Sequence, residues 1–298
     1  MPTRRRSSSL PWACPPKTDS APLKRWSSWR VTPPGANGVF DPMLGRRWAA
    51  AAWLLVGLAS VGLGPTAFAQ ATRDAASEQL YRQAVDELTA SDSQAKALAR
   101  LAESFAAGLP RPSRVLVEAA WEPIRREPET RRQLWSLLRD HARESEIEMV
   151  AADEPGRRLE LTLEFRDRDS GKPLIDRVVS LYHTDDAGDY TPEATSAGGG
   201  ADNPRLFACG RTDADGRLRV HTIVPGHYRG TQAPRHIHLG LQRPDQAAYG
   251  TGIYFESGEN GLDEELREER AQGRVFAATL PPGDEPATVR LELRIPAK

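Results

Sequence analysis

The sequence has very little cysteine, with Cys14 and Cys209 as its only two among 298 residues. This count excludes a disulfide framework and a thiolate zinc cluster. A metal site would therefore have to use histidine, tyrosine or carboxylate ligands. We interpret Cys209 as a small buried apolar residue.

A basic excess is missing from the part of the chain that we expect to fold. Residues 1–69 hold nine of the 40 Lys and Arg and two of the 41 Asp and Glu, so the rest holds 31 basic and 39 acidic side chains. The expected folded part is therefore net acidic. Phosphate binding needs a basic footprint, so we expect no nucleic acid partner.

A long uninterrupted apolar run is also absent. Residues 44–69 are mostly apolar, but helix-breaking residues interrupt them at Gly57, Gly62, Gly64 and Pro65. The segment begins with two arginines and ends in the small-x-small pattern Ala67-Phe68-Ala69, which is typical of a secretory signal peptide. We therefore predict a signal peptide over 43–69, no stable membrane anchor, and an exported protein that is periplasmic or extracellular.

Residues 1–42, which precede this signal, are rich in Ser, Pro and Arg. A signal peptide normally begins a chain. We therefore expect 1–42 to be a non-native or disordered upstream segment, with Met43 as the true start.

Residues 70–150 have a helical composition, and apolar residues recur there at helical spacing. One such face consists of Leu80, Ala84, Val85 and Leu88, and Leu134 to Leu138 indicate a last helix before His141. This helical segment holds no catalytic constellation. We interpret it as a packing or dimerisation element, which leaves a homodimer possible.

Residues 151–298 change to a two-residue period, as in Leu159, Leu161, Leu163 and Phe165. Further short alternating segments follow, joined by Gly and Pro turns such as 169–173 and 213–216. We therefore predict a mainly β protein, with an antiparallel β-sandwich catalytic domain preceded by an α-helical N-terminal segment.

The strongest chemical signal is the triplet His236-Ile237-His238. On a strand, its two imidazoles point to one face and supply half of a metal site. The triplet alone is weak, since many such pairs are surface residues. Tyr190 and Tyr228 lie upstream, and phenolate oxygen is a hard ligand that suits ferric iron better than zinc or copper.

Residues 158–255 resemble the intradiol ring-cleavage dioxygenases, the family of catechol and protocatechuate dioxygenases. The resemblance rests on Tyr190 in YHTDDAGDY, Tyr228 in IVPGHY, and His236 and His238 in HIH. It implies a bound Fe(3+) ligated by these four residues. It also implies a small catechol-type aromatic and dioxygen as the reaction partners.

The resemblance further implies an oxidoreductase that opens the ring between the two hydroxyls to give a cis,cis-muconate-type product. In the family, the tyrosine at the position of Tyr228 leaves the iron and helps to take a proton from the catechol. The tyrosine at the position of Tyr190 stays bound. Tyr228 is therefore the predicted catalytic residue.

One position departs from the family. An arginine is usual three residues before the first histidine, where this chain has Ala233. Arg235 is next to His236, but adjacent strand residues point to opposite faces. An alternative function thus stays open: a non-catalytic secreted β-sandwich binding module that retains the scaffold of the iron site.

Overall fold

The structure is a computed structural model that describes residues 65–296 except 91–92, 195–197, 232, 244–247 and 257–263. The expected upstream segment 1–42 and residues 43–64 of the expected signal peptide lie outside the described residues. Residues 65–69 form the first turns of helix α2. None of the described helices has both the length and the apolarity needed to cross a membrane.

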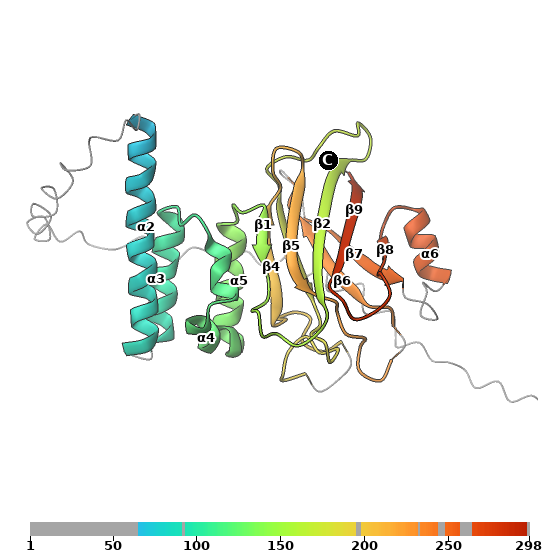
Figure 1. Cartoon of the computed structure of the whole chain (residues 1–298), viewed down its shortest axis with the longest axis horizontal. Helices are drawn as coiled ribbons and strands as arrows, with labels where there is room; N and C mark the ends of the chain where they lie inside the picture. Colours follow the sequence, from blue (N-terminus) through green and yellow to red (C-terminus); the bar gives the residue numbers. More distant parts are fainter. Residues whose placement is uncertain are drawn as a thin grey trace, which may run out of the picture.

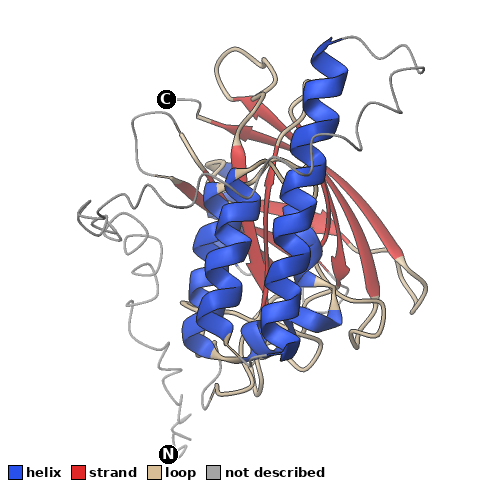
Figure 2. Cartoon of the chain, turned by 90° about the vertical axis from the view of Figure 1, so that its left-hand side faces the viewer, coloured by secondary structure: helices blue, strands red, loops and turns tan. Residues whose placement is uncertain are grey.

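Most of the helices come before the sheets in the chain. These are α2 (Pro65–Ala90), α3 (Gln94–Ala106), η3 (Pro112–Leu116), η4 (Ala119–Trp121), α4 (Glu122–Arg126) and α5 (Pro128–Asp140). Helix α6 (Glu264–Ala271) lies between β7 and β8. Helices α2 and α3 stand side by side in front of the strands in Figure 2. The buried face of α3 includes Leu98, Leu101 and Phe105, which are spaced three and four residues apart.

Nine described strands form two sheets (Figure 1). They are β1 (Glu146–Glu148), β2 (Arg158–Asp167), β3 (Val178–His183), β4 (Leu206–Arg211), β5 (Arg217–Ile223), β6 (His236–Leu241), β7 (Tyr249–Glu256), β8 (Phe276–Thr279) and β9 (Ala287–Ile295). One sheet has the order β1-β5-β2-β9 and the other β4-β3-β6-β7-β8. The alternating Leu159, Leu161, Leu163 and Phe165 of β2 are buried, as their period predicts.

Both sheets are mixed, so the prediction of an antiparallel β-sandwich is wrong in the direction of some strand pairs. The pairs β1–β5, β2–β9 and β7–β8 are parallel, whereas β2–β5, β3–β4, β3–β6 and β6–β7 are antiparallel. Strand β1 follows α5 in the chain, β8 follows α6, and β9 follows a strand of the other sheet. Such crossing connections allow parallel pairing, which a tight hairpin cannot produce.

Helix α5 joins the helical segment to the sandwich. It packs on β4, the edge strand of the five-stranded sheet, and one continuous hydrophobic core runs from α2 to β9. Strand β1 lies before the boundary expected at residue 150, yet it pairs with β5. The helices that precede the sheets therefore cover the edge of the sandwich at β1 and β4 (Figure 1).

Candidate metal centre

The four side chains predicted as metal ligands converge at one place in the sandwich. Tyr190 follows β3, Tyr228 follows β5, and His236 and His238 lie on β6. The Tyr190 hydroxyl is 2.8 Å from the Tyr228 hydroxyl and 2.7 Å from His238 Nε2. The Tyr228 hydroxyl is 2.9 Å from His236 Nε2, and the two Nε2 atoms are 3.2 Å apart. These four side chains are termed the four-donor cluster.

The four-donor cluster has fewer protons than polar contacts. Nδ1 of His236 lies 2.8 Å from the Pro234 carbonyl, which can only accept, so this nitrogen holds the proton of the neutral ring. Nε2 of His236 then carries a lone pair, and the four contacts share at most three protons. At least one pair of electron-rich atoms therefore meets without a proton between them. A cation would remove that repulsion.

Burial favours the neutral form of Tyr190, His236 and His238 in the absence of a cation. Tyr190 is 1% exposed, and this burial, together with Tyr228, raises the Tyr190 pKa. Burial lowers the pKa of His236, and burial with the neighbouring His236 lowers the pKa of His238. Neutral imidazole is the form that binds a metal. Two phenol oxygens and two imidazole nitrogens thus form a donor set that fits ferric iron.

Cross-strand neighbours hold the two imidazole planes. Tyr182 on β3 is the register partner of His238, with ring centroids 4.5 Å apart and planes 10° from parallel. Tyr254 on β7 is the partner of His236, with a centroid distance of 5.0 Å and an angle of 21°. Each imidazole therefore stacks on a phenol ring of a neighbouring strand. Tyr182 and Tyr254 are therefore packing residues of the site.

Hydrogen bonds to the backbone join the two loops that carry the tyrosines. The Thr184 hydroxyl donates to the Gly226 carbonyl at 2.9 Å, and the Gly226 amide donates to the Asp185 carbonyl at 2.9 Å. A Cβ at Gly188, which has φ +88°, would lie 1.7 Å from the His227 carbonyl oxygen. Glycine is therefore required for this approach. An ion pair between Arg229 and Asp189 joins the residues next to the two tyrosines.

The segment just before β6 supplies no guanidinium at position 233. Nδ1 of His227 donates to the Ala233 carbonyl at 3.0 Å, so His227 closes this loop. The Arg235 carbonyl accepts from the Phe255 amide, which fixes its backbone beside β7. Its guanidinium makes no hydrogen bond or ion pair with the residues that the structure describes.

His183 and Cys209 are buried residues with structural roles. Nδ1 of the fully buried His183 donates to the Thr184 carbonyl, and its Nε2 accepts from the Thr222 hydroxyl. Cys209 is buried as predicted, and burial raises its thiol pKa to about 12. Within the described ranges, no three His, Cys, Asp or Glu side chains group as a metal site. The four-donor cluster differs from such a site because two of its four donors are tyrosines.

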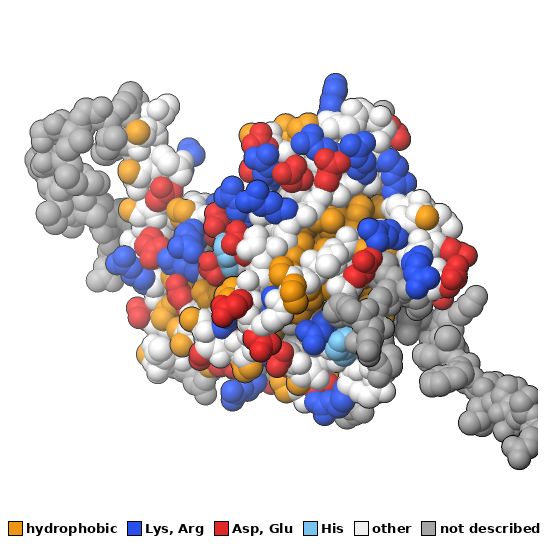
Figure 3. Space-filling model, turned by 45° about the vertical axis from the view of Figure 1, so that its right-hand side comes forward, with side chains coloured by type: hydrophobic (Ala, Val, Ile, Leu, Met, Phe, Trp, Pro, Cys, Tyr) orange, Lys and Arg blue, Asp and Glu red, His pale blue; other side chains and the backbone are white. Residues whose placement is uncertain are grey.

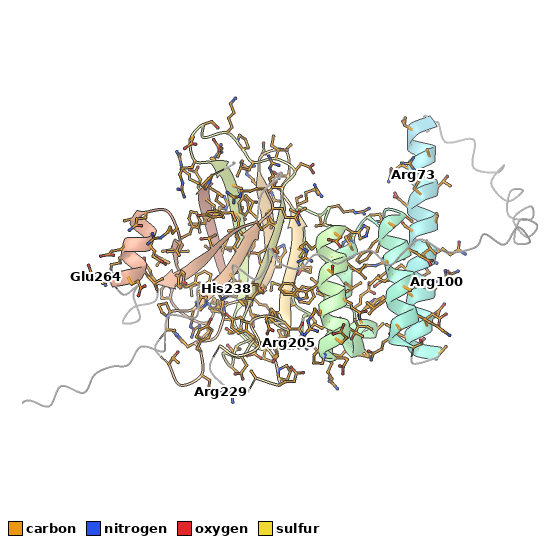
Figure 4. All side chains as sticks on the ribbon, turned by 180° about the vertical axis from the view of Figure 1, so that it is seen from behind. Arg73, Arg100, Arg205, Arg229, His238 and Glu264 are labelled. Carbon is orange, nitrogen blue, oxygen red and sulfur yellow. The ribbon has the colours of Figure 1, made fainter. Side chains whose placement is uncertain are left out.

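A separate cavity of about 480 Å³ lies between η3, α4 and residues 149–155. Arg205 lines it and forms a two-point ion pair with Glu154. Its backbone amide donates to the Tyr190 carbonyl at 2.7 Å, so one residue that lines the cavity also contacts the backbone of Tyr190. Figure 4 shows Arg205 between His238 and the helices. On the face in Figure 3, basic and acidic side chains are interspersed around a central hydrophobic area.

Residues 137–273 match the sequence model of a family described as Dioxygenase. This segment belongs to the intradiol ring-cleavage dioxygenase family. The match confirms the resemblance and extends beyond residues 158–255 on both sides. It begins inside α5 and ends just after α6.

Several solved dioxygenases are similar to this chain. The dioxygenase domain of a carbohydrate-binding fusion protein from Streptomyces sp. SirexAA-E is 22% identical, with 52% of this chain and 89% of that chain covered and a TM-score of 0.37. An intradiol ring-cleavage dioxygenase from Tetranychus urticae is 19% identical, with coverage of 52% and 87% and a TM-score of 0.39. Hydroxyquinol 1,2-dioxygenase from Pseudomonas putida DLL-E4 is 16% identical, with coverage of 75% and 99% and a TM-score of 0.38. Comparison with curated proteins gives no match.

Proposed function

We propose that this protein cleaves a catechol-type aromatic between its two hydroxyl-bearing carbons, using dioxygen and ferric iron. The observation that carries the proposal is the four-donor cluster, whose polar atoms lie 2.7–3.2 Å apart. The family assignment of residues 137–273 supports the reaction class. Tyr190, Tyr228, His236 and His238 would hold the iron. When bound, the iron supplies Lewis acidity and a template for the two catechol oxygens.

The two tyrosines have different surroundings, which supports different roles. Tyr190 is 1% exposed, and its ring lies 5.8 Å from that of Tyr182. Tyr228 is only partly buried and lies on the loop that leads to β6. Tyr190 is therefore the fixed ligand in this proposal. Tyr228 is the base that can turn outward and accept a proton from a catechol hydroxyl.

The imidazoles and their stacking partners keep the site in shape while Tyr228 moves. His236 is held by Tyr254 and by the Pro234 carbonyl, and His238 is held by Tyr182. In the overall reaction, the bond between the two hydroxyl-bearing carbons breaks. Each of these carbons gains one oxygen atom from dioxygen and becomes a carboxyl carbon. The substrate supplies the electrons, so no external reductant is required.

A second candidate function is a secreted module that binds the metal or an aromatic without cleaving it. Ala233 favours this alternative because the usual arginine is absent. The two candidates share the ligands and differ in turnover. A product formed under ¹⁸O₂ that carries both labelled atoms would decide for the enzyme.

We also propose that the protein is exported, with the segment 43–69 as its signal peptide. The proposal rests on the arginine pair, the interrupted apolar run and the small-x-small ending. N-terminal sequencing of the protein secreted from its host should find Gln70 as the first residue. Retention of residues 43–69 in the secreted protein would contradict export with cleavage.

The visible absorption spectrum of the iron-loaded protein tests the ligand set. Phenolate-to-iron charge transfer should give a coloured protein, and anaerobic addition of catechol should shift the band. Tyr190→Phe should remove most of the colour and activity. Tyr81→Phe on α2 is the matched control and should keep both. A wild-type protein that stays colourless after loading with ferric iron would overturn the proposal.

A further inference from the structure

Two side chains of helix α5 contact residues that adjoin the four-donor cluster. Arg131 and Trp135 are four residues apart, so both lie on one face of the helix. Both precede residue 137, where the family match begins. They belong to the helical segment, in which the sequence indicates no catalytic group.

The first route from α5 to the cluster is aromatic. The Trp135 ring lies 4.3 Å from the Phe207 ring and 5.8 Å from the Tyr182 ring. Phe207, Tyr182 and His238 are register partners across β4, β3 and β6, so their side chains share one face of the sheet. Tyr182 in turn stacks on His238. The indole therefore supports the ring against which His238 lies flat.

The second route is polar and runs through a buried guanidinium. Arg131 is 1% exposed, and its Nε donates to the Asn203 carbonyl at 3.1 Å. Its Nη1 donates to the carbonyls of Arg125 and Arg126, each at 3.0 Å. The side-chain amide of Asn203 in turn donates to the Pro128 carbonyl at 2.8 Å. These bonds tie the chain after Tyr190 to the start of α5.

The chain tied by Arg131 contacts both tyrosines of the cluster. A Cβ at Gly198 would lie 3.5 Å from the Tyr228 ring, so the backbone there passes close to this ring. At the other end of the loop, the Arg205 amide donates to the Tyr190 carbonyl. A shift at Asn203 would therefore be transmitted to the surroundings of Tyr190 and Tyr228.

We propose that Arg131 and Trp135 are positioning residues for the four-donor cluster. Trp135 acts through Tyr182 on His238, and Arg131 acts through Asn203 on the loop that follows Tyr190. The catalytic meaning of this role rests on the proposed function. In this proposal, the helical segment helps to orient the four ligand side chains.

Trp135→Leu tests the aromatic route in the full chain. Histidine ring signals of the metal-free protein should shift for His238, because its stacking partner moves. Ferric iron affinity should fall by about 10- to 100-fold, the usual effect of changing a ligand's support. Trp121→Leu is the matched control, since this buried indole of the helical segment bonds to Tyr81. It should leave the His238 signals in place.

Trp135→Phe retains an aromatic ring and should restore most of the wild-type His238 signals and iron affinity. This variant decides the matter if Trp135→Leu does not fold. Unchanged His238 signals in Trp135→Leu, or equal shifts in Trp121→Leu, would overturn the role of Trp135. The signals are read without metal, so they decide this point even if the wild-type protein fails to bind ferric iron.

Arg131→Lys tests the polar route because it keeps the charge and loses the fork geometry. In the iron-loaded protein, kcat should fall by about 10-fold or more with little change in KM. The absorption band should move at the same time. Arg132→Lys is the control, since Arg132 is exposed and pairs with Glu129 on the same helix. An Arg131→Lys protein with the wild-type band and kcat would overturn the role of Arg131.

Discussion

Tyr81 of the helical segment and Tyr190 of the sandwich are both buried phenols, but their hydrogen-bond surroundings differ. The Tyr81 hydroxyl donates to the Glu118 carboxylate at 2.5 Å and accepts from Trp121 Nε1 at 2.7 Å. The Arg114 guanidinium lies 3.4 Å from the Tyr81 ring centroid and balances the carboxylate. The hydroxyl proton of Tyr81 and the indole proton of Trp121 therefore both have acceptors, which is the usual state of buried polar groups.

The four-donor cluster lacks such a match, since its four contacts share at most three protons. Satisfied hydroxyl contacts such as those of Tyr81 stabilise the fold, whereas a network with too few protons is costly unless a ligand completes it. The comparison shows how a structural phenol differs from a phenol kept for chemistry. It also predicts which substitutions affect ligand binding and which affect stability.

The largest expected effect follows removal of a ligand imidazole. His236→Ala and His238→Ala should each lower ferric iron affinity by more than the roughly 10- to 100-fold that is typical of changing a residue that only supports a ligand. Equilibrium loading with metal analysis measures this. His221→Ala is the control, because His221 lies on β5 and pairs with Glu146. An equal loss of iron in His221→Ala would contradict the assignment of the four-donor cluster as the metal site.

A substitution at Gly188 should push apart the loop that carries Tyr190 and the loop that carries Tyr228. Gly188→Ala places a methyl group 1.7 Å from the His227 carbonyl oxygen at φ +88°. We expect the free energy of unfolding to fall by about 3 kcal/mol or more, from strain and the forced loop shift. Iron binding should weaken as well. Urea titration with metal analysis measures both effects.

Gly171→Ala is the control for this substitution. Gly171 has φ +69° with nothing within 4 Å of an added Cβ, so only the backbone penalty of about 1 kcal/mol applies. Equal losses in the two variants would show that the loop contact contributes nothing.

A pH titration sharpens the contrast with a histidine whose two nitrogens are both bonded. Burial lowers the pKa of His183 to about 4 from its usual 6.5. The unfolded chain therefore binds a proton at this residue below about pH 6.5, whereas the folded protein does so only near pH 4. The free energy of unfolding should fall by about 3 kcal/mol as the pH drops through this window.

Urea titrations at pH 7, 5.5 and 4 measure this slope. Because carboxylates also titrate there, the comparison is with His183→Gln, whose slope should be smaller. Equal slopes in the two proteins would contradict the assignment to His183.

The sequence contains enough information to predict the four donors but not their surroundings. The period of a strand puts His236 and His238 on one face whatever their neighbours are, and the family motifs supply Tyr190 and Tyr228. Strand register is a long-range property. The pairing of Tyr182 with His238 therefore could not be read from local spacing.

The parallel pairs were missed for a similar reason. The alternating Val289, Leu291 and Leu293 indicate a strand, but they do not indicate the direction in which β9 enters the sheet. Trp135 also had no local signal, since one aromatic residue on an apolar helix face is typical of a core. Its contact with Tyr182 depends on how α5 packs over β4.

The smallest expected effect compares the two phenols directly in the metal-free protein. Tyr81→Phe removes a hydroxyl that both donates and accepts, so it should lower the free energy of unfolding by about 1–2 kcal/mol. Tyr190→Phe removes a hydroxyl from a cluster that has fewer protons than contacts. The two contacts that remain can then each hold a proton. Its loss should be below about 0.5 kcal/mol, because functional sites are not optimised for stability. Urea unfolding of both variants without metal measures the difference. A Tyr190→Phe loss as large as that of Tyr81→Phe would mean that the four-donor cluster is already satisfied without a cation.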